Sequence, residues 1–191
     1  MTTKKDIRKH FLELRLNMPD AEAAELNNQL LQQVQLLTLS EIRIAHIFLP
    51  ISEKKEVDTW PMVKWFREHY PEIEWTISRS DMQSGDMQHF LWKTNTVLVK
   101  NKFGIPEPAS GELIEPSEID LVFVPMLAFD LHGHRIGYGK GMYDRFLHQC
   151  KPEVKTVGLS IFEPVTEIKD IEPWDIPLHS VVTPTQIYQF K

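Results

Sequence analysis

Hydrophobic and polar positions along the chain form two kinds of pattern, short apolar runs and segments in which apolar residues recur at helical spacing. The apolar runs predict strands at residues 43–51, 72–80, 89–93, 94–100, 121–125 and 154–162, and a last strand at 179–190 that is interrupted at Pro184. Helical spacing predicts helices at 3–17, 20–37, within 52–70 and at 142–150. Strands that alternate with helices predict an α/β protein, a three-layer, Rossmann-like fold with a largely parallel sheet flanked by helices. In such folds ligands bind at the C-terminal edge of the strands.

The segment 121–147 contains the strongest chemical signal. An apolar strand, LVFVP, is followed by the glycine loop GHRIGYGKG and then by the start of a helix. Glycines at 137, 139 and 141 allow positive φ and a close approach of the backbone to a ligand. Free N–H groups at a helix N-terminus bind anions, most often phosphate, and Arg135 and Lys140 add positive charge.

A glycine-rich surface turn is the alternative explanation of this loop. Three alternating glycines around a lysine, between a strand and a helix, favour the phosphate-binding interpretation. The spacing matches neither the GxGxxG dinucleotide motif nor the GxxxxGK[ST] loop of common NTPases, so neither class is supported.

Length and charge limit the class of protein further. The 191 residues suit one domain, 1–191, without internal repeats. The 27 acidic residues outnumber the 21 basic ones, for a net charge of -6, and no basic stripe occurs, so we expect no nucleic-acid partner. A single cysteine, Cys150, excludes an intramolecular disulfide, suggests a reducing compartment and is interpreted as a packing residue. No segment is apolar enough for a signal peptide or a membrane span, so we expect a soluble, cytoplasmic protein without a membrane partner.

The motif PMLAFD followed by GHRIGYGKGMYDRFL resembles the signature of the 5-formyltetrahydrofolate cyclo-ligase family, also called 5,10-methenyltetrahydrofolate synthetases. The resemblance continues, in the family's order, through KKDIRKHFLELR, ISEKKEVDT, FGIPEP and WDIPLHSVVT, and so covers nearly the whole chain. It implies an ATP-dependent ligase that converts 5-formyltetrahydrofolate to 5,10-methenyltetrahydrofolate and releases ADP and phosphate. The implied cofactors are ATP and Mg²⁺, and the implied partner is a small-molecule folate, with or without a polyglutamate tail. We expect a monomer.

The resemblance also assigns residues to sites. The implied nucleotide contacts are Lys4, Lys5, Arg8, Arg135, Ile136, Gly137, Tyr138, Gly139, Lys140, Gly141, Met142 and Tyr143. The implied folate contacts are Ile51, Glu56, Tyr138, Gly139, Lys140, Gly141 and Met142. Lys140 and Arg135 are the expected catalytic residues, and Asp144 and Asp175 the expected magnesium ligands. Met142 departs from the family, which usually has an aromatic residue there, so one folate contact differs.

Each of these residues also has an ordinary explanation. Lys4 and Arg8 could form a solvated cationic face of a helix, and Glu56 could be a surface carboxylate. Asp144 could simply interact with a helix dipole, while Asp175 would normally be a loop residue. Asp130 could support the glycine loop from behind by accepting its N–H groups, and FGIPEP could be a structural crossing or a rim of the pocket.

Two other functions remain compatible with a phosphate-binding loop. A sugar-phosphate or acyl-transfer enzyme would need a positioned base or nucleophile, and no compact motif supplies one. A nucleotide-sensing module would bind ATP without consuming it. His46 lies within an apolar run, and we interpret it as a core histidine with satisfied hydrogen bonds.

Overall fold

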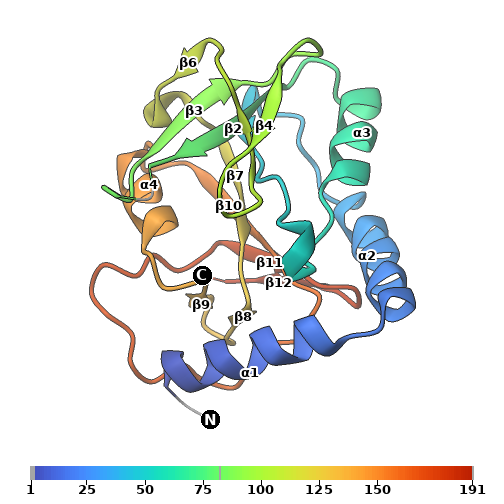
Figure 1. Ribbon diagram of the computed structural model, residues 1–191, viewed down its shortest axis with the longest axis vertical. Coiled ribbons are helices and arrows are strands. Elements are labelled where there is room, and N and C mark those ends of the chain that lie inside the picture. The colour runs from blue at the N-terminus through green and yellow to red at the C-terminus, as the bar shows by residue number, and fades with distance from the viewer. Residues whose placement is uncertain (1–2, 82, 191) are drawn as a thin grey trace.

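The computed structural model describes residues 3–81 and 83–190, and its centre is an eight-stranded sheet (Figure 1). The strand order is β12 (Ile187–Gln189), β11 (Ser180–Val182), β10 (Lys155–Leu159), β7 (Leu121–Pro125), β1 (Ile44–His46), β2 (Glu74–Ser80), β3 (Met87–Leu91) and β6 (Leu113–Ile114). The strands from β11 to β2 pair in parallel, and the outer ones are antiparallel. The largely parallel α/β sheet is therefore confirmed.

Helices cover both faces of this sheet. In β7, Leu121 and Phe123 point to the side of α2 (Asp20–Val34) and α3 (Trp60–His69), where they join one hydrophobic core. Val122 and Val124 point to the opposite side and pack with α4 (Met142–Gln149). Successive strand residues face opposite sides of a sheet, so a strand in which every residue is apolar can supply both cores.

The first helix, α1 (Lys4–Asn17), lies apart from these layers and crosses one end of the molecule beside β8 (Ala128–Phe129) and β9 (Arg135–Ile136) (Figure 1). Ile7 of α1 packs with Ala128 and Ile136 in a small separate core. The short hairpin of β8 and β9 follows β7, and its second strand forms part of the glycine loop, where we expected a loop alone. Two-residue strands are too short to produce a periodic pattern in the sequence.

Other elements differ from the prediction in detail. The apolar run 43–51 is a strand only over β1, and the expected single C-terminal strand is wrong, because β11 and β12 form an antiparallel hairpin around Pro184. The segment FGIPEP contains β5 (Pro106–Pro108), which pairs with β4 (Leu98–Lys100) in a separate two-stranded sheet. Prolines are tolerated there because the strand is short and lies at an edge. The 3-10 helices η1 (Ser52–Lys54) and η2 (Pro116–Glu118) complete the fold.

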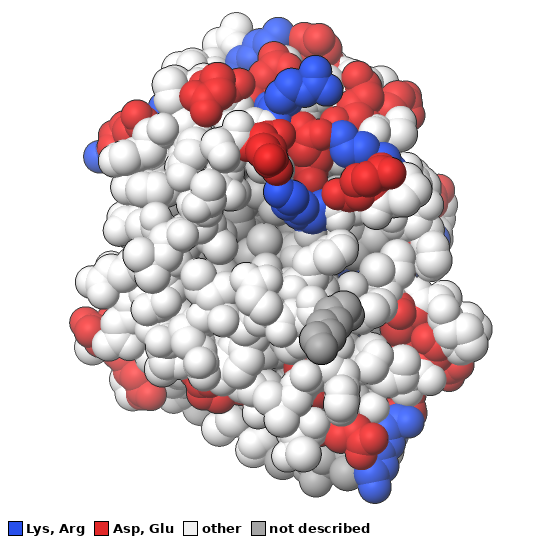
Figure 2. Space-filling view, turned by 180° about the vertical axis from the view of Figure 1, so that it is seen from behind, with Lys and Arg blue, Asp and Glu red and all other residues white. Residues whose placement is uncertain are grey.

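No helix in the described ranges is both long and apolar enough to span a membrane. Figure 2 shows the face opposite to that of Figure 1, on which Lys and Arg side chains lie among Asp and Glu side chains and gather mainly at one end. Charges of both signs are therefore mixed on this face.

Candidate active site

A cavity of about 750 Å³ opens at the C-terminal ends of β1, β2 and β7, where Phe48, Ser80 and Pro125 line it. This is the edge of the sheet at which an α/β fold is expected to bind ligands. Other parts of the wall come from the start of α1, the segments 51–56 and 103–106, the glycine loop, the first turn of α4 and the segment around Asp175. Parts of the chain that are distant in sequence therefore meet at one site.

Almost all the residues that the sequence assigned to a site line this cavity. They are Lys4, Arg8, Ile51, Glu56, Arg135, Ile136, Gly137, Tyr138, Gly139, Lys140, Gly141, Met142, Tyr143, Asp144 and Asp175. Lys5 is the exception, because it is exposed on α1 and lies outside the cavity lining. The structure thus brings the predicted nucleotide, folate and metal residues together, with that one residue outside.

The glycine loop has the backbone conformation that its glycines permit. Gly139 has φ +83°, and Gly141, with φ +63°, is the N-cap of α4 without a side-chain capping bond. These values lie in the left-handed region, which disfavours residues with a Cβ. Lys140, between the two, is exposed and lines the cavity, and no hydrogen bond or ion pair of its side chain occurs within the described ranges. Its ammonium group is therefore available to a ligand.

Arg135 is more constrained than Lys140. Its side chain is 7% exposed, and Nη2 lies 2.7 Å from Oδ1 of Asp144, while Nη1 donates to the carbonyl of Ile176. Burial lowers the pKa of Arg135, and the negative charge of Asp144 opposes that shift. The guanidinium is therefore a fixed positive charge in the cavity wall.

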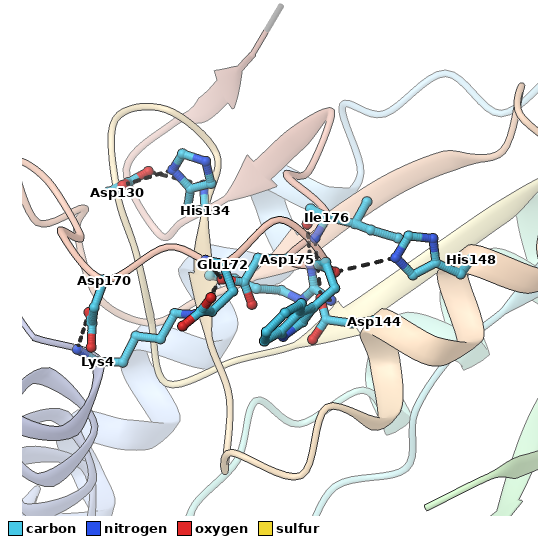
Figure 3. A network of polar contacts seen from close by, with 11 residues as sticks. Lys4, Asp130, His134, Asp144, His148, Asp170, Glu172, Asp175 and Ile176 are labelled. Carbon is cyan, nitrogen blue, oxygen red and sulfur yellow. Dashed lines mark hydrogen bonds and ion pairs between the residues drawn. The ribbon is translucent and has the colours of Figure 1, made fainter.

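The two proposed metal ligands, Asp144 and Asp175, lie in neighbouring parts of one polar network (Figure 3). Oδ1 of Asp144 accepts from the N–H of Ile176 at 3.3 Å as well as from Arg135. Oδ2 of Asp175 accepts from the N–H of Glu172 at 2.7 Å and pairs with Lys4. Both carboxylates therefore already have partners, one cation each.

No group of three or more potential metal ligands of the His, Cys, Asp or Glu type occurs among the described residues. Mg²⁺ in proteins usually takes only one or two carboxylates, and waters and substrate phosphates complete its octahedron. The oxygens of Asp144 and Asp175 fit this pattern in number and chemistry. A metal at these oxygens would compete with Arg135 and Lys4 for them.

Glu56 forms the polar centre of the other half of the cavity. The residue is 9% exposed; Oε2 accepts from the N–H of Ile51 at 2.7 Å, and Oε1 accepts from the hydroxyl of Tyr138 at 2.7 Å. Burial, and then the charge of Glu56, raises the pKa of Tyr138, so this tyrosine stays protonated. Apolar side chains such as Phe48 and Ile77 line the same cavity. A carboxylate between apolar walls suits a flat heterocycle with N–H donors.

Several cavity residues were not predicted from the sequence. Lys54 lies with Nζ 4.2 Å from the centre of the Tyr138 ring, and Arg145, Phe103 and Trp174 also line the cavity. All four lie in segments that carry the family resemblance, but the resemblance assigned none of them to a site. Only their position in the fold identifies them.

Residues outside the cavity have the supporting roles we expected. Asp130 accepts from the backbone N–H groups of His132 and His134 at 2.9 and 3.0 Å, and so holds the turn before the glycine loop. His46 is fully buried, with Nε2 3.3 Å from the hydroxyl of Tyr143. Cys150 packs against the core beside α4, and burial raises the pKa of its thiol to about 12.

Comparisons with known proteins identify the family of this chain. The family model described as "5-formyltetrahydrofolate cyclo-ligase family" matches residues 1–184. The 5-formyltetrahydrofolate cyclo-ligase of Escherichia coli (strain K12) is 27% identical over 165 residues, which is 82% of this chain and 87% of that protein. The NMR structure of Aquifex aeolicus 5,10-methenyltetrahydrofolate synthetase superposes with a TM-score of 0.82 at 29% identity, covering 98% of this chain and 93% of that one. The Mycoplasma pneumoniae 5,10-methenyltetrahydrofolate synthetase, at 23% identity with a TM-score of 0.71 over 95% and 98% of the two chains, shares the fold. This chain belongs to the 5-formyltetrahydrofolate cyclo-ligase family.

Proposed function

We propose that the protein is an ATP-dependent 5-formyltetrahydrofolate cyclo-ligase, which forms 5,10-methenyltetrahydrofolate, ADP and phosphate. The observation that carries this proposal is one cavity with two chemically different halves. One half has the glycine loop with Lys140 and Arg135, and the other has Glu56 between apolar walls. A triphosphate and a pterin therefore find complementary surfaces next to each other.

The chemistry explains why both ligands must bind together. The formyl group on N5 is an amide, so its carbon is a weak electrophile and its oxygen would leave as hydroxide. Transfer of the γ-phosphoryl group to that oxygen releases ADP and gives an iminium phosphate. N10 then attacks the activated carbon and loses its proton to solvent, and phosphate leaves as the ring closes. Such a transfer needs positioning and positive charge around the phosphoryl group, with no nucleophilic side chain from the protein.

The residues of the cavity supply these two requirements. Lys140, Arg135 and the backbone amides of the loop stabilise the charge that develops on the transferring group. Lys4 and Arg8, on one side of α1, hold other phosphate oxygens. Asp144 and Asp175 would hold Mg²⁺, which supplies further positive charge to the phosphates when it is bound.

On the folate side, Glu56 accepts N–H groups of the pterin, and Ile51 and Met142 contact its faces. Met142 offers a polarizable apolar surface in place of the family's aromatic ring, without a hydroxyl. We extend the proposal to folates with a polyglutamate tail as substrates, to a monomeric state and to the cytoplasm as the site of action.

One assay tests the proposal. Purified protein is mixed with Mg-ATP and 5-formyltetrahydrofolate, and the methenyl chromophore and released phosphate are followed together. We expect both signals to rise in equal amounts and to need both substrates. Nucleotide binding without phosphate release on addition of folate would instead indicate a sensing module. Absence of both binding and turnover would refute the proposed function.

A further inference from the structure

Arg15, near the C-terminal end of α1, is buried although it is charged. The residue is 3% exposed, and Nη1 donates to the carbonyl of Met126 at 3.3 Å, whereas Nε has no hydrogen-bond partner among the described residues. Nη2 donates to the hydroxyl of Tyr138. A buried guanidinium costs free energy unless it is paired, so the bond to Tyr138 is one of the few contacts that compensate it.

The hydrogen bonds around Tyr138 have a defined direction. An arginine side chain only donates, so the hydroxyl oxygen must accept from Arg15. The single hydroxyl proton is then donated to Oε1 of Glu56, at 2.7 Å, while Oε2 of Glu56 is held by the N–H of Ile51 at 2.7 Å. Arg15, Tyr138 and Glu56 therefore form a continuous chain that ends at the carboxylate in the cavity.

Helix α1 also contacts Gly137, the residue before Tyr138. Nε of Arg8 donates to the carbonyl of Gly137 at 2.9 Å, and Lys4 pairs with Asp175. These basic residues of α1 recur at spacings that place them on one side of the helix. Helix α1 is thus attached to two consecutive residues of the glycine loop, Gly137 through Arg8 and Tyr138 through Arg15.

We propose that Arg15 is a positioning residue for folate: through the Tyr138 hydroxyl it holds the carboxylate of Glu56 in the orientation that receives the substrate. This inference rests on the proposed function, because it takes Glu56 as the folate contact. Arg15 is absent from the cavity lining, so it acts through Tyr138. A hydroxyl that accepts from a cation is a stronger donor, and a carboxylate that is already oriented spends less free energy on ordering when a ligand binds.

The test is a double-mutant cycle on the full-length protein. Arg15→Met, Tyr138→Phe and the double variant are titrated with 5-formyltetrahydrofolate, and kcat and KM are measured for both substrates. Loss of a charge-assisted hydrogen bond predicts that folate affinity falls about tenfold in each single variant. Because both substitutions break the same chain, the double variant should lose little more than one of them alone. For Arg15→Met, KM for folate should change far more than kcat.

Two further variants separate positioning from simple structural support. Arg15→Lys keeps a donor cation and should recover part of the folate affinity that Arg15→Met loses. Lys9→Met changes an exposed charge on α1 outside the cavity lining and should leave folate affinity unchanged. If Arg15→Met does not fold, as judged by its thermal midpoint, Tyr138→Phe in the Arg15→Lys background completes the cycle.

The outcomes also distinguish this inference from the proposed function. Unchanged folate affinity in a folded Arg15→Met variant, or additive losses in the cycle, would overturn the role of Arg15 while wild-type turnover stands. A wild-type protein that binds folate without cyclising it would refute the proposed reaction, yet the non-additive pattern of affinities would still support Arg15. A wild-type protein without folate affinity would overturn both.

Discussion

Lys140 is the cavity cation whose removal should affect the reaction most directly. Its side chain is exposed on the loop, and no ion pair holds it within the described part of the chain. Replacing Lys140 with Ala removes a charge that is needed chiefly when the phosphoryl group transfers, so we expect turnover to fall by about 100-fold or more. Folate affinity should fall far less than turnover. Lys140→Arg, which keeps the charge, should retain part of the turnover, and unaltered turnover in Lys140→Ala would remove this residue from the mechanism.

Replacing Glu56 should weaken the binding of folate, the other substrate. In Glu56→Gln the side chain keeps its shape but gains an NH₂ group, which would face either the N–H of Ile51 or the hydroxyl of Tyr138, both donors here. We expect folate affinity to fall by about tenfold or more, and nucleotide affinity to stay nearly unchanged. Glu53→Gln is the matched control, because Glu53 is exposed, pairs with Lys100 and lies outside the cavity lining. Equal folate affinity in the two variants would argue against Glu56 as the folate contact.

Sequence reasoning located site residues where a motif or a family resemblance marked them. Gly139, Lys140 and Asp144 lie in one recognisable segment, and the cavity contains them. Arg15 and Trp174 were not found, although KKDIRKHFLELR ends at Arg15 and WDIPLHSVVT begins at Trp174, because the resemblance of a segment does not tell which of its other residues serve the site. A contact made through another side chain leaves no spacing pattern, so only the fold identifies such residues.

At the scale of the element, the glycine loop provides a matched pair of substitutions. An alanine at 139 would have to adopt the positive φ of Gly139, and its Cβ would lie 3.1 Å from Cζ of Arg8. A Cβ at position 137 would meet no atom within 4 Å. We expect Gly139→Ala to lose roughly 1–2 kcal/mol of stability and to displace Arg8. Gly137→Ala should keep the stability of the wild type. Urea unfolding and ATP titration of both variants test this, and equal values for the two would contradict the left-handed conformation at Gly139.

The elements that the sequence predicted well are those whose apolar positions form a clear run or a repeated helical spacing. The strand β7 and the helix α1 follow directly from their patterns. The hairpin of β8 and β9 did not, because two-residue strands show no period. The C-terminal hairpin was mistaken for one broken strand, since an apolar pattern gives the faces of a strand and not the point at which the chain reverses.

At the scale of the whole molecule, the net charge of -6 hides a local excess of positive charge. The basic residues that line the cavity are Lys4, Arg8, Lys54, Arg135, Lys140 and Arg145, and the acidic ones are Glu56, Asp144 and Asp175. The composition gives only the sign of the net charge. The fold places cations together in the cavity at the C-terminal edge of the strands. A protein with a negative net charge can therefore still attract a small polyanion to one place.

The stability of the whole fold should depend on pH through a buried histidine of β3. His89 is 2% exposed and stacks on Phe146 at 3.9 Å between ring centres, next to His46 at 5.1 Å. Neither ring nitrogen of His89 has a hydrogen-bond partner within the described ranges. Burial lowers the pKa of His89 from 6.5 to about 4, and the pKa of His46 is also lowered, by burial and by the charge that His89 would carry.

A lowered pKa means that the unfolded chain binds a proton at a pH at which the folded protein does not. The contribution of neutral His89 to the free energy of unfolding is therefore fully present above pH 6.5. It is lost as the pH falls toward about 4, which lowers the free energy of unfolding by roughly 3 kcal/mol. His89→Leu removes this titration, so its free energy of unfolding should fall less than that of the wild type over the same range. His132→Leu, at an exposed position, should follow the wild type. Denaturant unfolding from pH 7 to pH 4 measures all three, and parallel curves for wild type and His89→Leu would show that His89 does not fold as a buried neutral imidazole.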